Sequence, residues 1–160
     1  MRTHQNNVDL NIAMQRTLNR YLLLEQLGST GLGTVYRAQD PVQDREVCLK
    51  ILRPYICTDK ELLDRFSLEM ANVGHLDHPN ILDVYGKEND GDIHWVAMRH
   101  VSWPTLRQWL QQPIPVAQAM VILTQVAEAI EAGLREGINH GDIKPGNIFL
   151  DPETGEILLS

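Results

Sequence analysis

The sequence predicts an α+β fold in which an antiparallel sheet with one helix precedes a mainly helical half. Short apolar and β-branched segments, separated by turn residues, fill most of residues 20–101. In residues 116–134 the apolar positions instead recur at spacings of three and four, which is the periodicity of a helix. With 160 residues, 43% of them hydrophobic and 22% charged, the chain is long enough to bury a core of ordinary globular composition.

The first half is expected to begin near Arg20, because residues 1–19 have weak periodicity and indicate a mobile extension. Each expected strand is a short apolar run bounded by glycine, aspartate or proline. Five runs meet this description: residues 21–27, 33–38, 46–52, 81–85 and 93–98.

One helix is expected inside this half, over residues 58–74, where apolar positions recur with helical spacing. Thr58 can cap its N-terminus, and Glu61 three residues later completes a capping box. The Asp90-Gly91 pair between the last two strands is a strong signal for a hairpin turn. Residues 20–101 are therefore expected to form five antiparallel strands and one helix.

The second half, residues 102–160, is predicted to be mainly helical. A short helix is expected over residues 105–111 and a long one over residues 116–134. The long helix carries an apolar stripe that is expected to be its packing face: Val116, Met120, Leu123, Ala127, Ile130 and Leu134.

Composition excludes two classes of partner. The net charge is −7 and no basic stripe interleaves with aromatic residues, so a nucleic-acid partner is not expected. No apolar span approaches the length of a membrane helix, and the N-terminus lacks the apolar core of a signal peptide. These features predict a cytoplasmic protein with no membrane segment in this chain.

Residues 27–35 form a glycine-rich segment between two predicted strands. Glycine lets backbone N–H groups approach phosphate oxygens without a Cβ atom in the way. A Walker loop is excluded because no Gly-Lys-Ser/Thr follows, and a dinucleotide-binding fingerprint would open a helix, whereas Val35 continues a strand. Two interpretations remain open: a hairpin loop over the phosphates of a nucleotide, and an ordinary turn.

The run from His140 to Asn147, which precedes three apolar residues, places a carboxylate, an ammonium and a carboxamide at fixed offsets. Phosphoryl transfer uses this set of groups. Asp142 can accept a proton from an attacking hydroxyl, Lys144 can neutralise charge on the transferred phosphoryl group, and Asn147 can supply an oxygen to Mg²⁺. This segment is therefore the predicted catalytic loop.

Several motifs of residues 20–160 together resemble those of the eukaryotic-like, bacterial-type serine/threonine protein kinases. Besides the glycine-rich segment and the catalytic loop, these motifs are Val47-Cys48-Leu49-Lys50, Arg65-Phe66-Ser67-Leu68-Glu69 and His78-Pro79-Asn80-Ile81-Leu82. Lys144, two residues after Asp142, resembles serine/threonine rather than tyrosine kinases. Two positions depart from the family pattern, because Thr30 stands at the middle glycine and Gly141 replaces the usual arginine.

The resemblance implies an ATP-dependent, non-specific serine/threonine kinase that uses Mg²⁺ and acts on protein substrates. It also implies a protein-kinase-like fold, with residues 20–101 as the N-lobe and residues 102–160 as an incomplete C-lobe. The implied catalytic residues are Asp142, Lys144 and Asn147, and Asn147 is also the implied metal ligand. The implied ATP-binding residues are Leu27, Gly28, Gly31, Gly33, Val35, Cys48, Lys50, Glu69, Met98, Val101 and Leu150.

The chain ends just before the position of the family's Asp-Phe-Gly motif, so the resemblance implies a truncated domain that is weakly active or inactive. The alternative is a catalytically impaired, pseudokinase-like binding module that docks on another chain. In either case the apolar stripe of the long helix is expected to lack part of its cover, which favours a homodimer or a second chain over that face.

Overall fold

A computed structural model describes residues 17–160, apart from the side chain of Glu69. The chain forms two compact units. The first unit runs to Ala71 and resumes over Val84–His100, and the second holds Asn72–Asp83 and Val101–Ser160. Most of the expected N-terminal extension, residues 1–16, lies outside the described residues. Each unit has its own apolar core.

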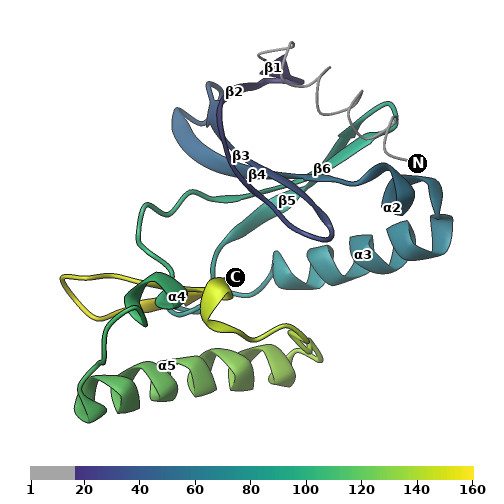
Figure 1. The fold of residues 1–160 in the computed structure, drawn as a ribbon. Coiled ribbons are helices and arrows are strands. Elements are labelled where there is room, and N and C mark those ends of the chain that lie inside the picture. The colour runs from purple at the N-terminus through teal and green to yellow at the C-terminus, as the bar shows by residue number, and fades with distance from the viewer. Residues whose placement is uncertain (1–16) are drawn as a thin grey trace. The chain divides into compact units, whose positions relative to one another are not determined.

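The first unit is built on a six-stranded sheet whose order is β1-β2-β3-β4-β6-β5 (Figure 1). All neighbouring strands are antiparallel, as predicted. The strands are β1 (Thr17–Leu18), β2 (Tyr21–Ser29), β3 (Gly33–Asp40), β4 (Arg45–Leu52), β5 (Val84–Asp90) and β6 (Ile93–Arg99). The structure thus adds one two-residue edge strand to the five that were expected from the sequence.

The predicted strand over residues 81–85 is wrong in its first half. Ile81 forms a parallel bridge with Leu159, and the N–H of Leu82 donates to the carbonyl of Leu159 at 2.8 Å. These contacts belong to the second unit, whereas β5 of the first unit begins only at Val84. One apolar run is therefore divided between the two units, which periodicity does not reveal.

Two helices follow β4 where the sequence predicts one: α2 (Pro54–Thr58) and α3 (Lys60–Val73). Thr58 is the last residue of α2, and its Oγ1 donates to the carbonyl of Pro54 at 3.1 Å. Asp59 takes the predicted capping role of Thr58, since its Oδ1 accepts the N–H of Leu62 at 3.1 Å near the start of α3.

Buried Asp40, at the end of β3, is held by several polar groups of the first unit. Its Oδ1 accepts the N–H groups of Val42 at 3.0 Å and Gln43 at 3.3 Å, and Arg20 Nε lies 3.4 Å from its Oδ2. Burial by itself would raise the pKa of Asp40. The hydrogen bonds from Gln43 and Val42 and the charge of Arg20 outweigh burial, so the pKa lies below the ordinary value of 3.8.

The ionised form of Asp40 is expected to stabilise the protein. Because its pKa is lower in the folded than in the unfolded chain, this contribution is complete above the ordinary pKa of 3.8 and is lost as the pH falls below it. Asp40→Asn should cost about 1–3 kcal/mol at neutral pH and should remove this part of the acid sensitivity. Denaturant midpoints measured from neutral pH to about pH 3 test the prediction, and parallel pH profiles for parent and variant would contradict it.

The second unit contains two helices, a 3-10 helix and a two-stranded antiparallel sheet. These are α4 (Leu106–Trp109), α5 (Val116–Arg135), η1 (Pro145–Asn147), β7 (Ile148–Leu150) and β8 (Ile157–Leu159). Thr105 caps α4 in a capping box with Gln108. The core joins α5 to the two strands and consists mainly of Ile122, Val126, Ala129, Ile148, Leu150, Ile157 and Leu159.

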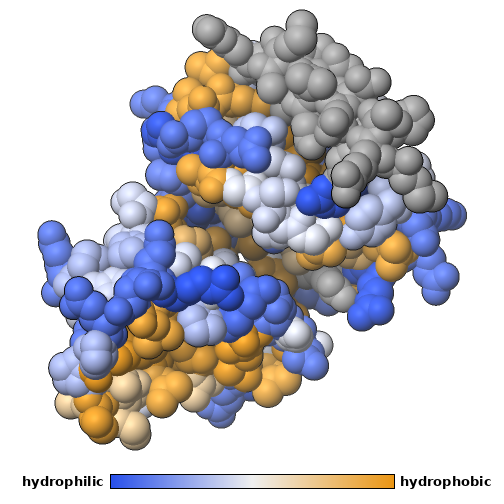
Figure 2. All heavy atoms as spheres, in the orientation of Figure 1, coloured by the Kyte–Doolittle hydropathy of each residue, from blue (hydrophilic) through white to orange (hydrophobic). Residues whose placement is uncertain are grey.

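The packing face of α5 differs from the predicted one. Its buried residues are Ile122, Val126, Ala129 and Gly133. Of the predicted stripe, only Ile130 packs against the core, while Val116, Met120, Leu123, Ala127 and Leu134 are exposed. Apolar side chains consequently gather on the surface over α5 (Figure 2).

Candidate functional site

The glycine-rich segment forms the turn between β2 and β3, which agrees with both interpretations left open by the sequence. Thr30 closes this turn, because its N–H donates to the carbonyl of Gly33 at 2.7 Å. Its Oγ1 also lies 3.2 Å from both the carbonyl oxygen and the amide nitrogen of Gly33. At the position where the kinase pattern has its middle glycine, Thr30 thus holds the turn together.

The three glycines of the turn have different roles. A Cβ atom at Gly33 would collide with the backbone carbonyl of Ile51 on the paired strand β4, so the sheet itself requires glycine there. A Cβ atom at Gly28 or Gly31 would meet no other atom within 4 Å. Gly28 and Gly31 therefore leave space beside the backbone, as a turn that contacts phosphate needs.

Four predicted ATP-binding residues share one face of the first unit's sheet. In the register of the strands Val35 pairs with Lys50, and Cys48 pairs with Met98. Their neighbours along the strands, including Tyr36, point to the opposite face, which carries the unit's core. The lysine therefore lies on the same face as the three candidate contacts for the base.

The remaining predicted nucleotide contacts are only partly described. Glu69 belongs to α3, but its side chain lies outside the described residues, so its ion pair with Lys50 stays a prediction. Leu27 is exposed on β2, and Val101 is half-buried just after β6. Leu150 is fully buried in the core of the second unit.

The predicted catalytic residues come together in the second unit. Lys144 Nζ lies 2.6 Å from Asp142 Oδ2, and Asn147 Nδ2 donates to the same oxygen at 3.0 Å. Asn147 Nδ2 also donates to the backbone carbonyl of Asp142 at 2.8 Å. The short helix η1, which starts at Pro145, brings Asn147 back toward Asp142.

His140 fixes the backbone of this loop. The N–H of Asp142 donates to His140 Nδ1 at 3.2 Å, so in the neutral ring Nε2 carries the proton. That Nε2 lies 3.1 Å from the carbonyl oxygen of Ser160, whose own N–H donates to the carbonyl of Asn147 at 2.9 Å. Gly141, between the two side chains, has a φ of +73°, a region that favours glycine.

The electrostatics of the loop keep Asp142 ionised. The hydrogen bond from Lys144, and after it the one from Asn147, hold the pKa of this exposed carboxyl below its ordinary value of 3.8. At neutral pH the side chain is therefore a carboxylate that can accept a proton or contact a cation.

Oxygen atoms suited to Mg²⁺ are present in the same loop. Because Nδ2 of Asn147 faces Asp142, the amide oxygen Oδ1 is the atom that remains for a metal. Within residues 17–160 no three His, Cys, Asp or Glu side chains are grouped to hold a metal ion. The amide oxygen of Asn147 and the carboxylate of Asp142 are hard oxygen ligands, which fit an ion such as Mg²⁺ that takes one or two protein oxygens besides phosphates.

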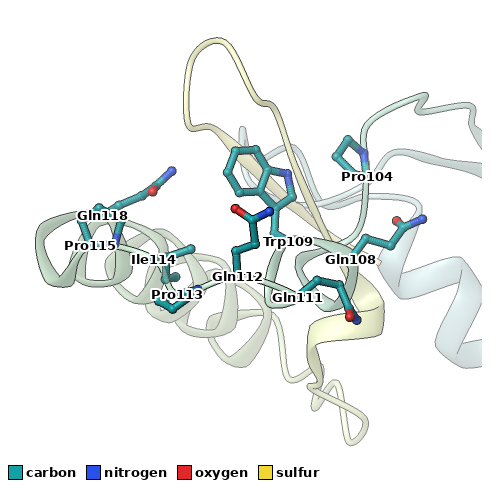
Figure 3. Close-up of a pocket in the computed structure, with 9 residues that line it drawn as sticks. All are labelled: Pro104, Gln108, Trp109, Gln111, Gln112, Pro113, Ile114, Pro115 and Gln118. Carbon is teal, nitrogen blue, oxygen red and sulfur yellow. The ribbon is translucent and has the colours of Figure 1, made fainter.

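A separate pocket of about 370 Å³ lies in the second unit, between α4 and the start of α5 (Figure 3). It is lined by Pro104, Gln108, Trp109, Gln111, Gln112, Pro113, Ile114, Pro115 and Gln118. None of these residues is a predicted site residue, and none carries the positive charge that recognition of phosphate favours. The pocket is therefore distinct from the candidate site.

Two contacts to the glycine turn could not be predicted from the sequence. Arg53 Nη2 donates to the carbonyl of Thr30 at 3.0 Å, and the hydroxyl of Tyr55 donates to the carbonyl of Gly31 at 3.1 Å. An arginine and a tyrosine just after a strand predict only surface side chains. Their role depends on the path of the chain after β4.

Comparison with known protein families gives a match over nearly all of the described chain. A family model described as protein kinase domain matches residues 21–160. The serine/threonine-protein kinase PrkC of Bacillus subtilis is 37% identical over 139 residues, which are 86% of this chain and 22% of PrkC. PknL of Mycobacterium tuberculosis is 33% identical over 144 residues, which are 89% of this chain and 36% of PknL.

Solved structures agree with this match. The crystal structure of the PknI kinase domain of Mycobacterium tuberculosis superposes with a TM-score of 0.79 at 31% identity. The superposition covers 89% of this chain and 59% of the PknI chain. The present chain therefore spans less than two thirds of each of these relatives.

Proposed function

We propose, since the chain belongs to the protein kinase family and to its bacterial serine/threonine branch, that the protein transfers the γ-phosphoryl group of ATP to serine or threonine hydroxyls of proteins. The observation that carries this proposal is the convergence of Lys144 and Asn147 on one carboxylate oxygen of Asp142. A base, a cation and a metal-binding amide are thereby held within one short loop.

Asp142 is the proposed catalytic base. As the acceptor hydroxyl attacks the γ-phosphorus, its proton passes to Asp142, and the bond to the departing ADP oxygen breaks. The low pKa keeps the carboxylate ready to accept a hydrogen bond, and the bonds to Lys144 and Asn147 fix its orientation. The charge of Lys144 offsets the negative charge on the transferred group.

The first unit is proposed to bind the nucleotide. Lys50 holds the phosphates together with the glycine turn, where Gly28 and Gly31 leave room for close approach. Within this unit, the contacts to the base are proposed for Leu27, Val35, Cys48 and Met98. Val101 and Leu150 belong to the second unit, and their contact with the base stays a prediction from the sequence. Mg²⁺, when bound, neutralises phosphate charge, and Asn147 Oδ1 is the proposed protein ligand.

The test is phosphate transfer by the natural full-length protein. With γ-labelled ATP and a protein acceptor, we expect the label on serine and threonine residues. Absence of transfer under conditions in which the protein is folded and binds ATP would contradict the proposed activity.

A partner on α5 is a second proposal, favoured by one observation. The exposed stripe of α5 includes Val116, Leu123 and Leu134, which are 80%, 61% and 57% exposed. Large apolar side chains gathered on a surface favour association. We propose that this face is covered by a second copy of the chain, or by another chain in the binding-module alternative.

Self-association of the 160-residue chain should therefore depend on this stripe. We expect the parent to form dimers or larger species at micromolar concentration and Leu123→Glu to weaken them by about tenfold or more, because a charge would be buried in an apolar contact. Thr124→Glu, at an exposed neighbouring position, is the matched control. Sedimentation measures the effect, and a monomeric parent would refute the prediction.

Within residues 17–160, none of the helices has both the length and the apolar character of a membrane span. A cytoplasmic location is proposed on the ground that the reaction consumes ATP.

A further inference from the structure

The segment that follows β4 donates hydrogen bonds to the glycine turn. The two residues that donate them, Arg53 and Tyr55, are not among the residues assigned to nucleotide binding. Arg53 comes three positions after Lys50 and is the last residue before helix α2, and Tyr55 is the second residue of that helix. Both belong to the first unit, as does the turn. Nothing in the proposed reaction requires either side chain.

The contacts cover four successive residues of the turn. Arg53 Nη2 donates to Ser29 Oγ and to the carbonyl of Thr30, both at 3.0 Å, and Nε donates to the same carbonyl at 3.2 Å. The backbone N–H of Arg53 donates to the carbonyl of Leu32 at 2.9 Å. The hydroxyl of Tyr55 donates to the carbonyl of Gly31 at 3.1 Å.

These bonds engage the carbonyl oxygens of Thr30, Gly31 and Leu32. A carbonyl oxygen is partly negative and repels phosphate, whereas backbone N–H groups attract it. A glycine-rich turn without such bonds samples many backbone conformations, and ordering it on binding costs free energy. Holding three carbonyls in place reduces that cost before the nucleotide arrives.

We infer that Arg53 and Tyr55 are positioning residues that preorganise the glycine turn for the phosphates of ATP, an inference that rests on the proposed nucleotide site. They act through the turn and do not touch the nucleotide. The guanidinium supplies two donors in a rigid fork to Thr30, which the single ammonium of lysine does not reproduce. The tyrosine supplies one hydroxyl.

Calorimetry with ATP and with adenosine tests this inference on the full-length protein. Tyr55→Phe removes one oxygen from a side chain that is 55% exposed, so folding should be preserved. We expect Tyr55→Phe to weaken ATP binding by about threefold to tenfold, and Arg53→Gln by about tenfold or more. Adenosine, which lacks phosphates, should bind the parent and both variants equally.

Two further variants separate the possible failures. Arg135→Gln removes an equal charge from α5, where Arg135 pairs with Glu131, and should leave ATP affinity unchanged. Lys50→Ala reports on the proposed nucleotide site itself, and full ATP affinity in that variant would refute the site.

If Lys50→Ala weakens ATP binding while Tyr55→Phe and Arg53→Gln do not, only the positioning role is overturned. An equal loss for adenosine and ATP would also overturn it, since that result indicates a general structural role. If Arg53→Gln fails to fold, Tyr55→Phe decides alone.

Discussion

Replacing Asp142 by asparagine is expected to lower phosphoryl transfer by the full-length protein by about 10²- to 10⁴-fold. Asparagine has nearly the same shape, but its carboxamide does not accept the proton of the attacking hydroxyl. It also replaces the charged oxygen on which Lys144 and Asn147 converge at 2.6 and 3.0 Å. Steady-state turnover with a protein acceptor measures the effect.

Asp151 provides a matched carboxylate outside the catalytic loop. Its Oδ1 accepts the N–H of Glu153 at 2.8 Å in the β7–β8 turn, and backbone hydrogen bonding to Glu153 is the main cause of its lowered pKa. Asp151→Asn should therefore leave turnover close to that of the parent. Equal turnover in the parent and Asp142→Asn would remove Asp142 from the role of base.

A single methyl group at Gly33 is expected to destabilise the first unit by about 3 kcal/mol, the upper part of the usual range for overpacking. The Cβ of Gly33→Ala would collide with the backbone carbonyl of Ile51, and a backbone atom has no rotamer by which to move away. Against a typical net stability of about 5–15 kcal/mol, this is a large fraction. The midpoint of denaturant unfolding measures it.

Gly28→Ala and Gly31→Ala are the controls, because a Cβ atom at either position has open space around it. Their unfolding midpoints should stay near that of the parent. Their affinity for ATP should nevertheless fall, since the added methyl group occupies space that the phosphates need. A loss of stability in all three variants would show that the collision at Gly33 is not the cause.

Strands β2, β3, β4 and β6 were predictable because they are short, largely apolar or β-branched runs between turn residues, and the Asp90-Gly91 turn agrees with the hairpin of β5 and β6. Strand β5 overlaps its predicted run only at Val84 and Tyr85, and β1 was not predicted. The packing face of α5 was not predictable from spacing. Both Ile122-Val126-Ala129 and Met120-Leu123-Ala127 follow the helical period, so two stripes satisfy one pattern. Contact with β7 and β8 selects the first stripe, and that contact is tertiary.

The proximity of the proposed catalytic residues was predictable because they lie within eight consecutive residues, His140 to Asn147. The need for glycine at position 33 was not predictable, since it depends on Ile51 of the paired strand, 18 positions along the chain (51 − 33). The same holds for Arg53 and Tyr55, whose partners in the turn are more than twenty residues away. Long-range contacts of exposed polar side chains leave no local pattern.

The most direct test of the central claim is to identify the amino acid that receives phosphate. The full-length protein and its Asp142→Asn variant are each incubated with γ-labelled ATP, Mg²⁺ and a protein acceptor, and the labelled residues are identified after hydrolysis. We expect phosphoserine and phosphothreonine with the parent, because the similar kinases PrkC and PknL are serine/threonine-protein kinases. We expect little label with the variant, because asparagine does not accept the proton of the attacking hydroxyl. Label found only on tyrosine, or label transferred equally by both proteins, would contradict it.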